Sequence, residues 1–378
     1  MASCCSTRCG RAISPRWLDD VKIQRTYLRP TAFVDAPFGH DGKVARLAGG
    51  MAWFSAVEII RADGAELVQV EGIVSRLDER TRPIWDRLTT TCPPLTLGER
   101  VVRLDQPQVM GIVNLTPDSF SGDGLAADAE AAITAGHAMA SAGAAIVDVG
   151  GESTRPGAKA VWDGDEIARV EPVVRRLASA GTAVSIDTRK ATVMEAALGA
   201  GARLINDVSA LSWDPNAAGV VAAAGCPIVL MHHKGDPETM QDDPRYERPV
   251  LLEIYDWLEA RIEAAVAAGI DRSRIIVDPG FGFGKTVRHN LQLMNGLALL
   301  HGLGCPLMLG ASRKRTIGAL SNEAPADRRL AGSLAFALKA AEQGAQFVRV
   351  HDVAETVQAL RVWRGLRDAA LTPEASRR

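Results

Sequence analysis

The stretch VMGIVNLTPDSFSGDG, residues 109–124, decides between the two folds that the sequence allows. Its first five residues, 109–113, are largely apolar and predict a buried strand, and Asn114 follows directly. A doubly wound open sheet that binds a dinucleotide would carry the glycine pattern GxGxxG after its first strand. This turn does not have that pattern. The strand therefore ends on a polar side chain and a long loop.

The same pattern of an apolar strand followed by a helix recurs seven times further along the chain. Eight such units in about 250 residues are typical of a (β/α)₈ barrel, also called a TIM barrel, which is an α/β fold. A doubly wound open sheet is the alternative, because periodicity does not show closure. The predicted strands are 109–113, 145–149, 183–186, 203–205, 228–231, 274–277, 306–309 and 346–350, and the predicted helices include 127–142, 165–180, 191–201, 249–268, 327–343 and 353–367.

Polar and charged residues stand at the carboxyl ends of all eight predicted strands. In a barrel these ends meet on one face, where the connecting loops build the active site. A purely structural role would favour apolar or capping residues at most of these positions, although Asn206 or Ser312 alone could cap a helix. Together they predict a ligand site lined by Asn114, Asp148, Asp187, Asn206, His232, Asp278, Ser312 with Lys314, and Arg349 with His351.

Composition narrows the class of protein. The 378 residues are 47% hydrophobic, include 35 glycines and are only 5% aromatic, which fits an α/β enzyme with many tight turns. A net charge of −2 gives no reason to expect nucleic acid or an acidic membrane surface as a partner. No run approaches the ~20 apolar residues of a spanning helix, and the six cysteines show no metal-ligand or disulfide framework. We expect a cytoplasmic enzyme that acts on small molecules.

Three regions are expected along the chain. Residues 1–20 lack the apolar core of a secretory signal and read as a disordered or mis-assigned start. Residues 21–100 form a small accessory α/β segment of unknown role, with strand-like runs at 44–47, 56–60 and 66–70, a helical candidate at 78–88 and a connection at 89–100. Residues 101–378 form the catalytic barrel domain.

Seven motifs in the barrel region resemble those of the dihydropteroate synthases. They are MGIVNLTPDSFSGDG (110–124), DVGGESTRPGA (148–158), SIDTRK (185–190), INDVSAL (205–211), VDPGFGFGKT (277–286), LGASRKRTIG (309–318) and RVHDV (349–353). This family of transferases condenses 6-hydroxymethyl-7,8-dihydropterin diphosphate with 4-aminobenzoate, which gives 7,8-dihydropteroate and pyrophosphate in folate biosynthesis. Its members are sulfonamide targets. Residues 1–100 lie outside the resemblance.

The resemblance implies a pterin pocket made by Asp187, Asn206, Asp278, Lys314 and Arg349. A reduced pterin presents several N–H groups and one carbonyl on one edge. Carboxylates accept hydrogen bonds from such N–H groups, and the carboxamide of Asn206 can both donate and accept. Lys314 would donate to the pterin carbonyl and a ring nitrogen, and Arg349 would lie over the ring or reach the diphosphate.

The resemblance also implies where the other substrate groups bind. The diphosphate would be held by Asn114, Arg349 and His351, with Asn114 supplying an oxygen ligand to a Mg²⁺ cofactor. Because the reaction expels pyrophosphate, stabilising negative charge is the main catalytic task, and it falls to these three residues and Lys314. The residues expected to meet 4-aminobenzoate are Thr154, Arg155, Pro156 and Ser312. Arg313 would project outward or pair with an acid, and the effect of Arg315 stays open.

Other features have a structural and a functional interpretation. The glycine- and proline-marked loops 116–124 and 153–157 are expected to close over bound substrates. Adjacent residues on a strand point to opposite faces, so His232 and His233 make a poor chelating pair and favour structural roles. Phe281 and Phe283 are expected to shape the pocket wall. Members of the family often form homodimers through outer helices, and a homodimer is expected here.

The sequence leaves three alternatives to dihydropteroate synthesis. A pterin-dependent methyltransferase has a similar barrel but normally works with a corrinoid partner, and the SRK and TRPG sequences favour the synthase. A bifunctional protein with the preceding pyrophosphokinase would need more than residues 1–100. A pterin-binding protein without catalytic activity remains an alternative, although the anion-binding and loop residues are all present.

Overall fold

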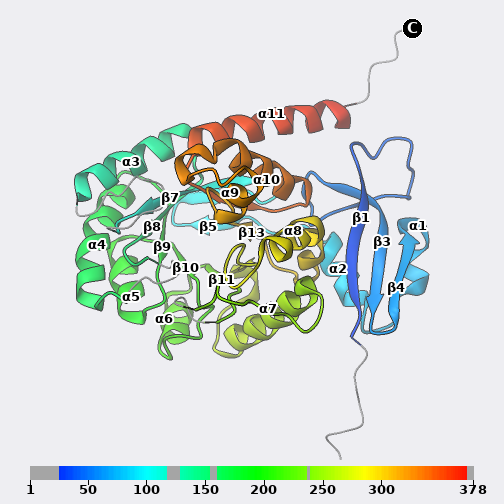
Figure 1. Ribbon diagram of the computed structural model, residues 1–378, viewed down its shortest axis with the longest axis horizontal. Coiled ribbons are helices and arrows are strands. Elements are labelled where there is room, and N and C mark those ends of the chain that lie inside the picture. The colour runs from blue at the N-terminus through cyan, green and yellow to red at the C-terminus, as the bar shows by residue number, and fades with distance from the viewer. Residues whose placement is uncertain (1–24, 117–127, 154–159, 236–238, 373–378) are drawn as a thin grey trace, which may run out of the picture.

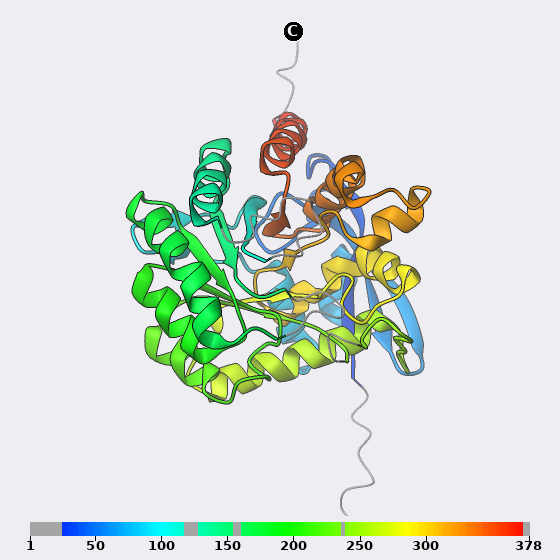
Figure 2. The same ribbon diagram turned by 60° about the vertical axis from the view of Figure 1, so that its left-hand side comes forward.

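A computed structural model describes residues 25–116, 128–153, 160–235 and 239–372 and shows a barrel with a smaller sheet packed against its side (Figure 1 and Figure 2). The barrel has eight parallel strands, which pair in the order β12-β11-β10-β9-β8-β7-β14-β13. The strands are β7 (Gln108–Asn114), β8 (Ile146–Gly150), β9 (Val184–Asp187), β10 (Leu204–Asp207), β11 (Ile228–Met231), β12 (Ile275–Asp278), β13 (Met308–Leu309) and β14 (Phe347–Val350).

The ring of strands closes between β12 and the residues that precede β13. A parallel bridge pairs Val277 with Leu307, and the Val277 N–H donates to the carbonyl of Pro306 at 2.9 Å. On the other side, the Leu307 N–H donates to the side-chain Oε1 of Gln346 at 2.8 Å, so a buried side chain completes the ladder there. The predicted (β/α)₈ barrel is confirmed, and the open-sheet alternative is wrong.

The helices form a layer outside the ring (Figure 2). Asp128 caps the first of them by accepting hydrogen bonds from the N–H groups of Glu130 and Ala131, and Gly143 ends it with a φ of 108°. The helices of the barrel, among the described residues, are α3 (Ala129–Ala142), α4 (Asp163–Ser179), α5 (Ala191–Ala200), α6 (Ala217–Ala224), α7 (Val250–Ala267), α8 (Val287–Gly296), α9 (Arg315–Leu320), α10 (Leu330–Glu342) and α11 (Val353–Leu371). The 3₁₀ turns are η2 (Arg272–Arg274), η3 (Leu297–Leu303) and η4 (Ala326–Arg328). Helices α6, α8 and α9 add to those that the periodicity predicts.

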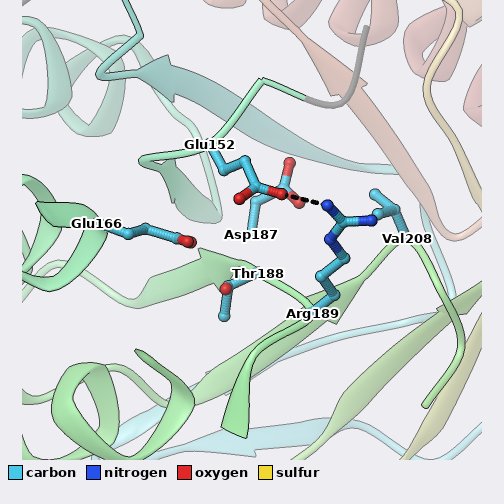
Figure 3. A pocket seen from close by; sticks show the side chains of 6 residues that line it. All are labelled: Glu152, Glu166, Asp187, Thr188, Arg189 and Val208. Atoms are coloured by element: carbon cyan, nitrogen blue, oxygen red, sulfur yellow. Dashed lines mark hydrogen bonds and ion pairs between the residues drawn. The ribbon is translucent and has the colours of Figure 1, made fainter. Parts of the chain in front are cut away.

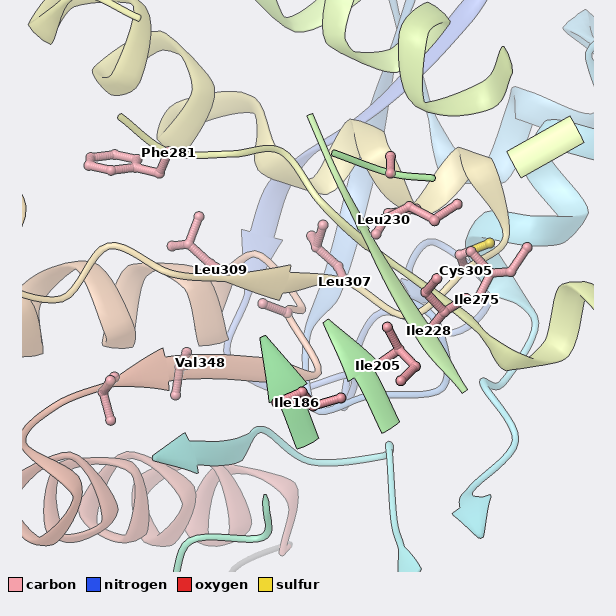
Figure 4. Close-up of a cluster of buried hydrophobic side chains, with 14 of the residues drawn as sticks. Ile186, Ile205, Ile228, Leu230, Ile275, Phe281, Cys305, Leu307, Leu309 and Val348 are labelled. Carbon is pink, nitrogen blue, oxygen red and sulfur yellow. The ribbon is translucent and has the colours of Figure 1, made fainter. Parts of the chain in front are cut away.

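Alternation along the strands builds the main core. One set of side chains points outward and packs under the helices, and Figure 4 shows Ile186, Ile205, Ile228, Ile275 and Val348 of this set. The intervening residues point into the barrel. Burial on both faces explains why these strands read as continuous apolar runs.

A hairpin covers the amino end of the barrel. It consists of β5 (Leu95–Leu97) and β6 (Arg100–Val102), which pair antiparallel. Leu95, Leu97 and Val102 are buried in one cluster with inward-pointing residues such as Ile146 and Phe347. Residues 89–100 therefore contain more than the expected connection. The two leucines alternate with a threonine, and the barrel end supplies the surface that makes this short strand stable.

The accessory segment is an antiparallel sheet of β1 (Tyr27–Val34), β2 (Ala45–Arg46), β3 (Trp53–Arg61) and β4 (Gly64–Gln69), with β3 pairing all three others. Helices α1 (Val70–Ile73) and α2 (Arg82–Thr89) and the turn η1 (Val74–Arg76) complete it. Its own core includes Phe54 and Leu88 and reaches Ala298 of η3, so it is packed onto the barrel. Among the described residues, no helix is both long enough and apolar enough to span a bilayer.

Candidate active site

Polar residues line the carboxyl end of the barrel because of strand alternation. Within several strands the inward positions change from apolar to polar toward the carboxyl end. On β8, Ile146 and Asp148 both point inward, and on β14 the pair is Phe347 and Arg349. The apolar member packs above the hairpin at the closed end. The polar member is therefore placed at the open end by the same periodicity that builds the core.

Arg349 joins two carboxylates across the barrel. Its Nε donates to Oδ2 of Asp148 at 2.6 Å, and its Nη2 donates to Oδ2 of Asp187 at 2.7 Å. The side-chain amide of Asn206 also donates to Oδ2 of Asp148, at 2.9 Å. The structure thus brings Asp187, Asn206 and Arg349 together, as expected, and adds Asp148, which the sequence placed at a strand end without a role.

Two acceptor atoms of this cluster have no partner. Oδ1 of Asp148 and Oδ1 of Asp187 are buried and accept no hydrogen bond from any described residue. Burial raises the pKa of Asp187 to about 7 despite the attraction of Arg349, and the nearby carboxylate of Asp148 adds to the rise. Buried acceptors without donors are costly, so the cluster is suited to a ligand that brings N–H groups.

Lys314 and Asp278 lie on the neighbouring part of the same face. The Asp278 Oδ1 accepts from the N–H of Gly280 at 2.7 Å, and the Lys314 ammonium donates to the carbonyl of Phe281. The same ammonium lies 4.2 Å from the ring centroid of Phe283, in a cation–π contact. Burial raises the pKa of Asp278, and the charge of Lys314 opposes that rise.

The two phenylalanines of this motif have different surroundings. Phe283 lies beneath Lys314 at the pocket, as expected. Phe281 is fully buried and packs edge-on against Phe336 of α10, with ring centroids 5.0 Å apart. The expectation that Phe281 shapes the pocket wall is wrong, because the turn after β12 directs this ring into the core (Figure 4).

The protonation of Lys314 gives a first prediction. Burial lowers the pKa of Lys314 to about 7, while Asp278 opposes the shift. In the unfolded chain the lysine pKa is about 10.4, so between these values the unfolded state binds more protons and the free energy of unfolding rises with pH. We expect this rise to be smaller in Lys314→Met, measured by urea unfolding between pH 7 and 10. Parallel curves for the two proteins would contradict this assignment.

Ser312 and His351 form a hydrogen-bonded pair. The Ser312 hydroxyl accepts from the backbone N–H of His351 at 3.2 Å and lies 3.0 Å from Nδ1 of the same residue. Burial, followed by the charges of Arg349 and Arg313, lowers the pKa of His351 to about 3. The uncharged imidazole can accept a hydrogen bond from the Ser312 hydroxyl at Nδ1 and donate its own N–H at Nε2 to an anion.

The three consecutive cations of residues 313–315 have separate environments. Arg313 has a φ of 56° and pairs with Asp352, with its Nε 3.0 Å from Oδ2, so the expected pairing with an acid is confirmed. This ion pair joins the turn after β13 to the start of α11. Lys314 points to the pocket and Arg315 is exposed on α9.

A buried ion network that the sequence did not predict flanks the cluster (Figure 3). Lys190 is 1% exposed, and its Nζ lies 2.5 Å from Oε2 of Glu152 and 2.6 Å from Oε2 of Glu166. Arg189 donates to Oε1 of Glu152 at 2.7 Å. Glu152 and Lys190 each also bond to the backbone of Val161, so the network ties together the chain on both sides of residues 154–159.

Part of this ion network could have been predicted from charged residues in two of the sequence motifs. Glu152 follows the glycines of DVGGES, and Arg189 and Lys190 follow Asp187 in SIDTRK. Charged residues so close to a barrel strand end are candidates for the active face. Glu166 lies on α4, where an acid in the first turn reads as a helix-dipole residue, and no local signal predicts its full burial.

His232 is part of the scaffold and its imidazole is buried. Its Nδ1 lies 2.9 Å from the Nζ of Lys285, and its ring packs edge-on against Trp257 with centroids 5.0 Å apart. His233 is partly exposed, with Nδ1 3.3 Å from the carbonyl of Gly235. The described residues contain no cluster of three or more His, Cys, Asp or Glu that could hold a metal. The buried contacts of His232 with Lys285 and Trp257 support the structural interpretation of this histidine.

Some expected site residues cannot be placed. Thr154, Arg155 and Pro156 lie outside the described residues, as do residues 117–124 of the first expected closing loop. Asn114 is described: it ends β7, and a methyl group built on Gly150 would lie 3.6 Å from its Oδ1 and 3.4 Å from Cβ of Asp187. The carboxamide oxygen of Asn114 is thus beside the carboxylate cluster.

Comparison with known proteins agrees with this geometry. Residues 110–351 match the family model described as pterin binding enzyme. The chain is 48% identical over 274 residues to a dihydropteroate synthase of Neisseria meningitidis serogroup B, which covers 71% of this chain and 96% of that protein. It is 46% identical over 260 residues to the Escherichia coli dihydropteroate synthase, which covers 68% and 91%.

A solved structure supports the same assignment. The Yersinia pestis dihydropteroate synthase, in complex with a sulfonamide drug, aligns with a TM-score of 0.70 and 45% identity and covers 73% of this chain and 99% of that one. The accessory segment precedes the residues that match the family model. Over its barrel, this chain belongs to the pterin-binding enzymes and, among them, to the dihydropteroate synthases.

Proposed function

We propose that the chain catalyses the condensation of 6-hydroxymethyl-7,8-dihydropterin diphosphate with 4-aminobenzoate. The products are 7,8-dihydropteroate and pyrophosphate, on the path to folate. A Xanthomonas albilineans dihydropteroate synthase with 4-aminobenzoic acid bound aligns with this chain at 48% identity and a TM-score of 0.68. The observation that carries the proposal is the cluster at the barrel mouth, with two buried carboxylate oxygens that lack donors.

The pterin fits this cluster by hydrogen-bond complementarity. Its 2-amino group and ring N–H groups would donate to the free oxygens of Asp148 and Asp187 and to Asp278. Asn206 is fixed by donating to Asp148, which leaves its carbonyl oxygen as an acceptor. Lys314, held above the ring of Phe283, would donate to the pterin carbonyl. The contacts to Asp148 and Asp187 satisfy two oxygens that are otherwise buried at a cost.

The diphosphate would bind at Asn114, Arg349 and His351. Arg349 is already directed into the barrel mouth by two carboxylates, and His351 can donate an N–H without carrying a charge. A Mg²⁺ ion fits a site with one carboxamide oxygen, because this ion usually keeps waters and takes its remaining ligands from phosphate oxygens. Asn114 Oδ1 would be its protein ligand, and the ion would supply positive charge to the leaving pyrophosphate.

The aminobenzoate would bind beside this site. Its carboxylate would lie beside Ser312, and Thr154, Arg155 and Pro156 would line the approach. The bond from the pterin methylene carbon to the diphosphate oxygen breaks, and the amine nitrogen forms the new bond to that carbon and then loses a proton. Stabilisation of the departing pyrophosphate by Arg349, Lys314 and His351 is the main contribution of the chain, and no covalent enzyme intermediate is needed.

The test of the function is an assay for pyrophosphate release with Mg²⁺. We expect release only when the pterin diphosphate and 4-aminobenzoate are both present, with 7,8-dihydropteroate formed in equal amount. Binding of the pterin without any product would favour the non-catalytic alternative, and methyl transfer in place of condensation would favour the methyltransferase.

A second prediction concerns the pterin pocket. Asp278→Asn should weaken binding of a pterin diphosphate by roughly 1.5–3 kcal/mol, the usual contribution of a charge-assisted hydrogen bond. The amide can still accept from the Gly280 N–H, so the turn should be preserved. Calorimetric titration measures the change, with Asp243→Asn as the matched control, because Asp243 is exposed and pairs, among the described residues, only with Arg245. Equal affinity of both variants would argue against the assignment.

A further inference from the structure

A second pocket lies away from the active site, between the accessory segment and the barrel. Its volume is about 590 Å³, within the range of sites that bind small molecules. One wall is formed by α2 and the turn before it, and the other by α7. Figure 1 shows these two helices on the side of the barrel that faces the accessory sheet. Nothing in the proposed reaction uses this pocket.

The pocket is strongly basic. Four arginines line it, against two acids, and the arginines are Arg25, Arg61, Arg80 and Arg87. Both acids are already engaged: Glu259 pairs with Arg25, and the Asp78 carboxylate accepts from the N–H groups of Arg80 and Thr81 in a turn, at 3.1 and 2.8 Å. Arg61 lies 3.9 Å from Glu66, so the guanidinium groups of Arg80 and Arg87 are the ones that exceed the carboxylates available among the described residues. Such an excess favours an anionic ligand.

Two buried polar atoms in the pocket lack partners. The hydroxyl of Tyr255 and the Nε of Arg87 are buried and form no hydrogen bond with any described residue. Tyr255 is only 2% exposed and lines the pocket from α7. Burial raises the pKa of its phenol, so the group stays neutral and can donate. A buried hydroxyl without a partner costs free energy, and a ligand oxygen would remove that cost.

We infer that this pocket binds a small organic molecule that carries a diphosphate. Guanidinium groups bind phosphate oxygens in pairs of hydrogen bonds, and the two of Arg80 and Arg87 suit two adjacent phosphates. A volume of about 590 Å³ exceeds what inorganic pyrophosphate alone would fill, and Ile84 gives the wall an apolar part. Because the ligand would touch α2 and α7 together, it would stabilise the contact between the accessory segment and the barrel.

The test uses ADP and inorganic pyrophosphate as probes on the full chain. Calorimetry should show saturable binding of ADP, weakened roughly tenfold or more in the Arg80→Gln, Arg87→Gln double variant. Arg82→Gln is the matched control, because Arg82 is on the same helix, is exposed and pairs with Asp86 instead. Pyrophosphate is also the product expected at the active site, so the comparison uses the affinity that the double variant loses: a larger loss for ADP than for pyrophosphate supports an organic ligand.

Tyr255→Phe gives an independent readout. Its ring contact with Tyr27 is kept, and removal of the unpartnered hydroxyl should leave the thermal midpoint of the free protein equal or higher. The increase in midpoint on adding ADP should become smaller. The inference is overturned if wild type does not bind ADP, if the double variant loses more affinity for pyrophosphate than for ADP, or if the double variant binds ADP as tightly as wild type. The last result would place ADP at the active site. These outcomes are independent of catalysis.

Discussion

Replacing Arg349 with Met should lower kcat/KM by roughly 10²–10³-fold, since a donor aimed at a developing negative charge contributes about that much. It should also lower the free energy of unfolding by about 3–5 kcal/mol, because one partner of a buried ion pair is removed. The carboxylates of Asp148 and Asp187 would lose their shared cation inside the barrel. Pyrophosphate release and urea unfolding measure the two effects.

Two further variants make this result specific. Arg349→Lys keeps the charge but has no planar fork to join two carboxylates, so it should recover only part of both losses. Arg364→Met removes an exposed arginine that lies 3.8 Å from Asp368, and should change stability by less than about 1 kcal/mol. The loss in Arg349→Met should also shrink at pH 5, where the unpaired carboxylates can take up protons. If Arg349→Met has nearly wild-type activity and stability, the assignment of Arg349 to the active site is wrong.

Replacing Lys190 with Met should destabilise the protein by about 3–5 kcal/mol, although the residue touches no substrate. Burial alone would lower the pKa of Lys190, but the hydrogen bonds that its ammonium donates to Glu152 and Glu166 outweigh burial and raise the pKa. The lysine is thus charged and is the cation that both carboxylates share. Without it, Glu166 is a buried acid with no exposed surface and no charge partner among the described residues.

A rescue experiment separates charge from packing. Adding Glu166→Gln to Lys190→Met should restore part of the lost free energy of unfolding, because the uncompensated charge is removed. Lys339→Met is the control: Lys339 is only half-buried, lies 3.6 Å from Glu342 and should contribute at most about 1 kcal/mol. Equal losses for the two lysines, or no gain in the double variant, would mean that the network is not what stabilises this part of the barrel.

The parts of the fold that could be predicted are those that depend on local periodicity. Strands β7 to β12 and β14 lie where the apolar runs predict them, and the polar residues at their ends follow from the same reading. The hairpin β5–β6 could not be predicted, because its leucines are buried by packing against the end of the barrel, a contact that the local sequence does not show. Strand β13 is shorter than the run at 306–309, because the ladder there is completed by the side chain of Gln346.

The site was predictable as a set of residues, and its contacts were not. Asp148 and Arg349 are 201 positions apart, and only the closed ring places them in contact. Two other features depend on tertiary packing, which the sequence does not show. Glu166 is buried by neighbouring elements, and the ring of Phe281 points into the core, a direction that the spacing of the motif does not predict. The roles of the expected pterin, diphosphate and aminobenzoate residues remain predictions that the variants above will test.

The closure between β12 and β13 has a consequence for motion. Ladders such as those of β7 with β8 involve several residues of each strand, whereas the closure involves one bridge, at Val277 and Leu307. Local opening takes the path that breaks the fewest contacts. Amide hydrogen exchange at this seam should therefore be faster than in β8 or β9. Asp278 ends β12, and Ser312 and Lys314 follow β13, so these three residues should move when the seam opens, while Asp148, Asp187 and Asn206 stay fixed on strands β8 to β10.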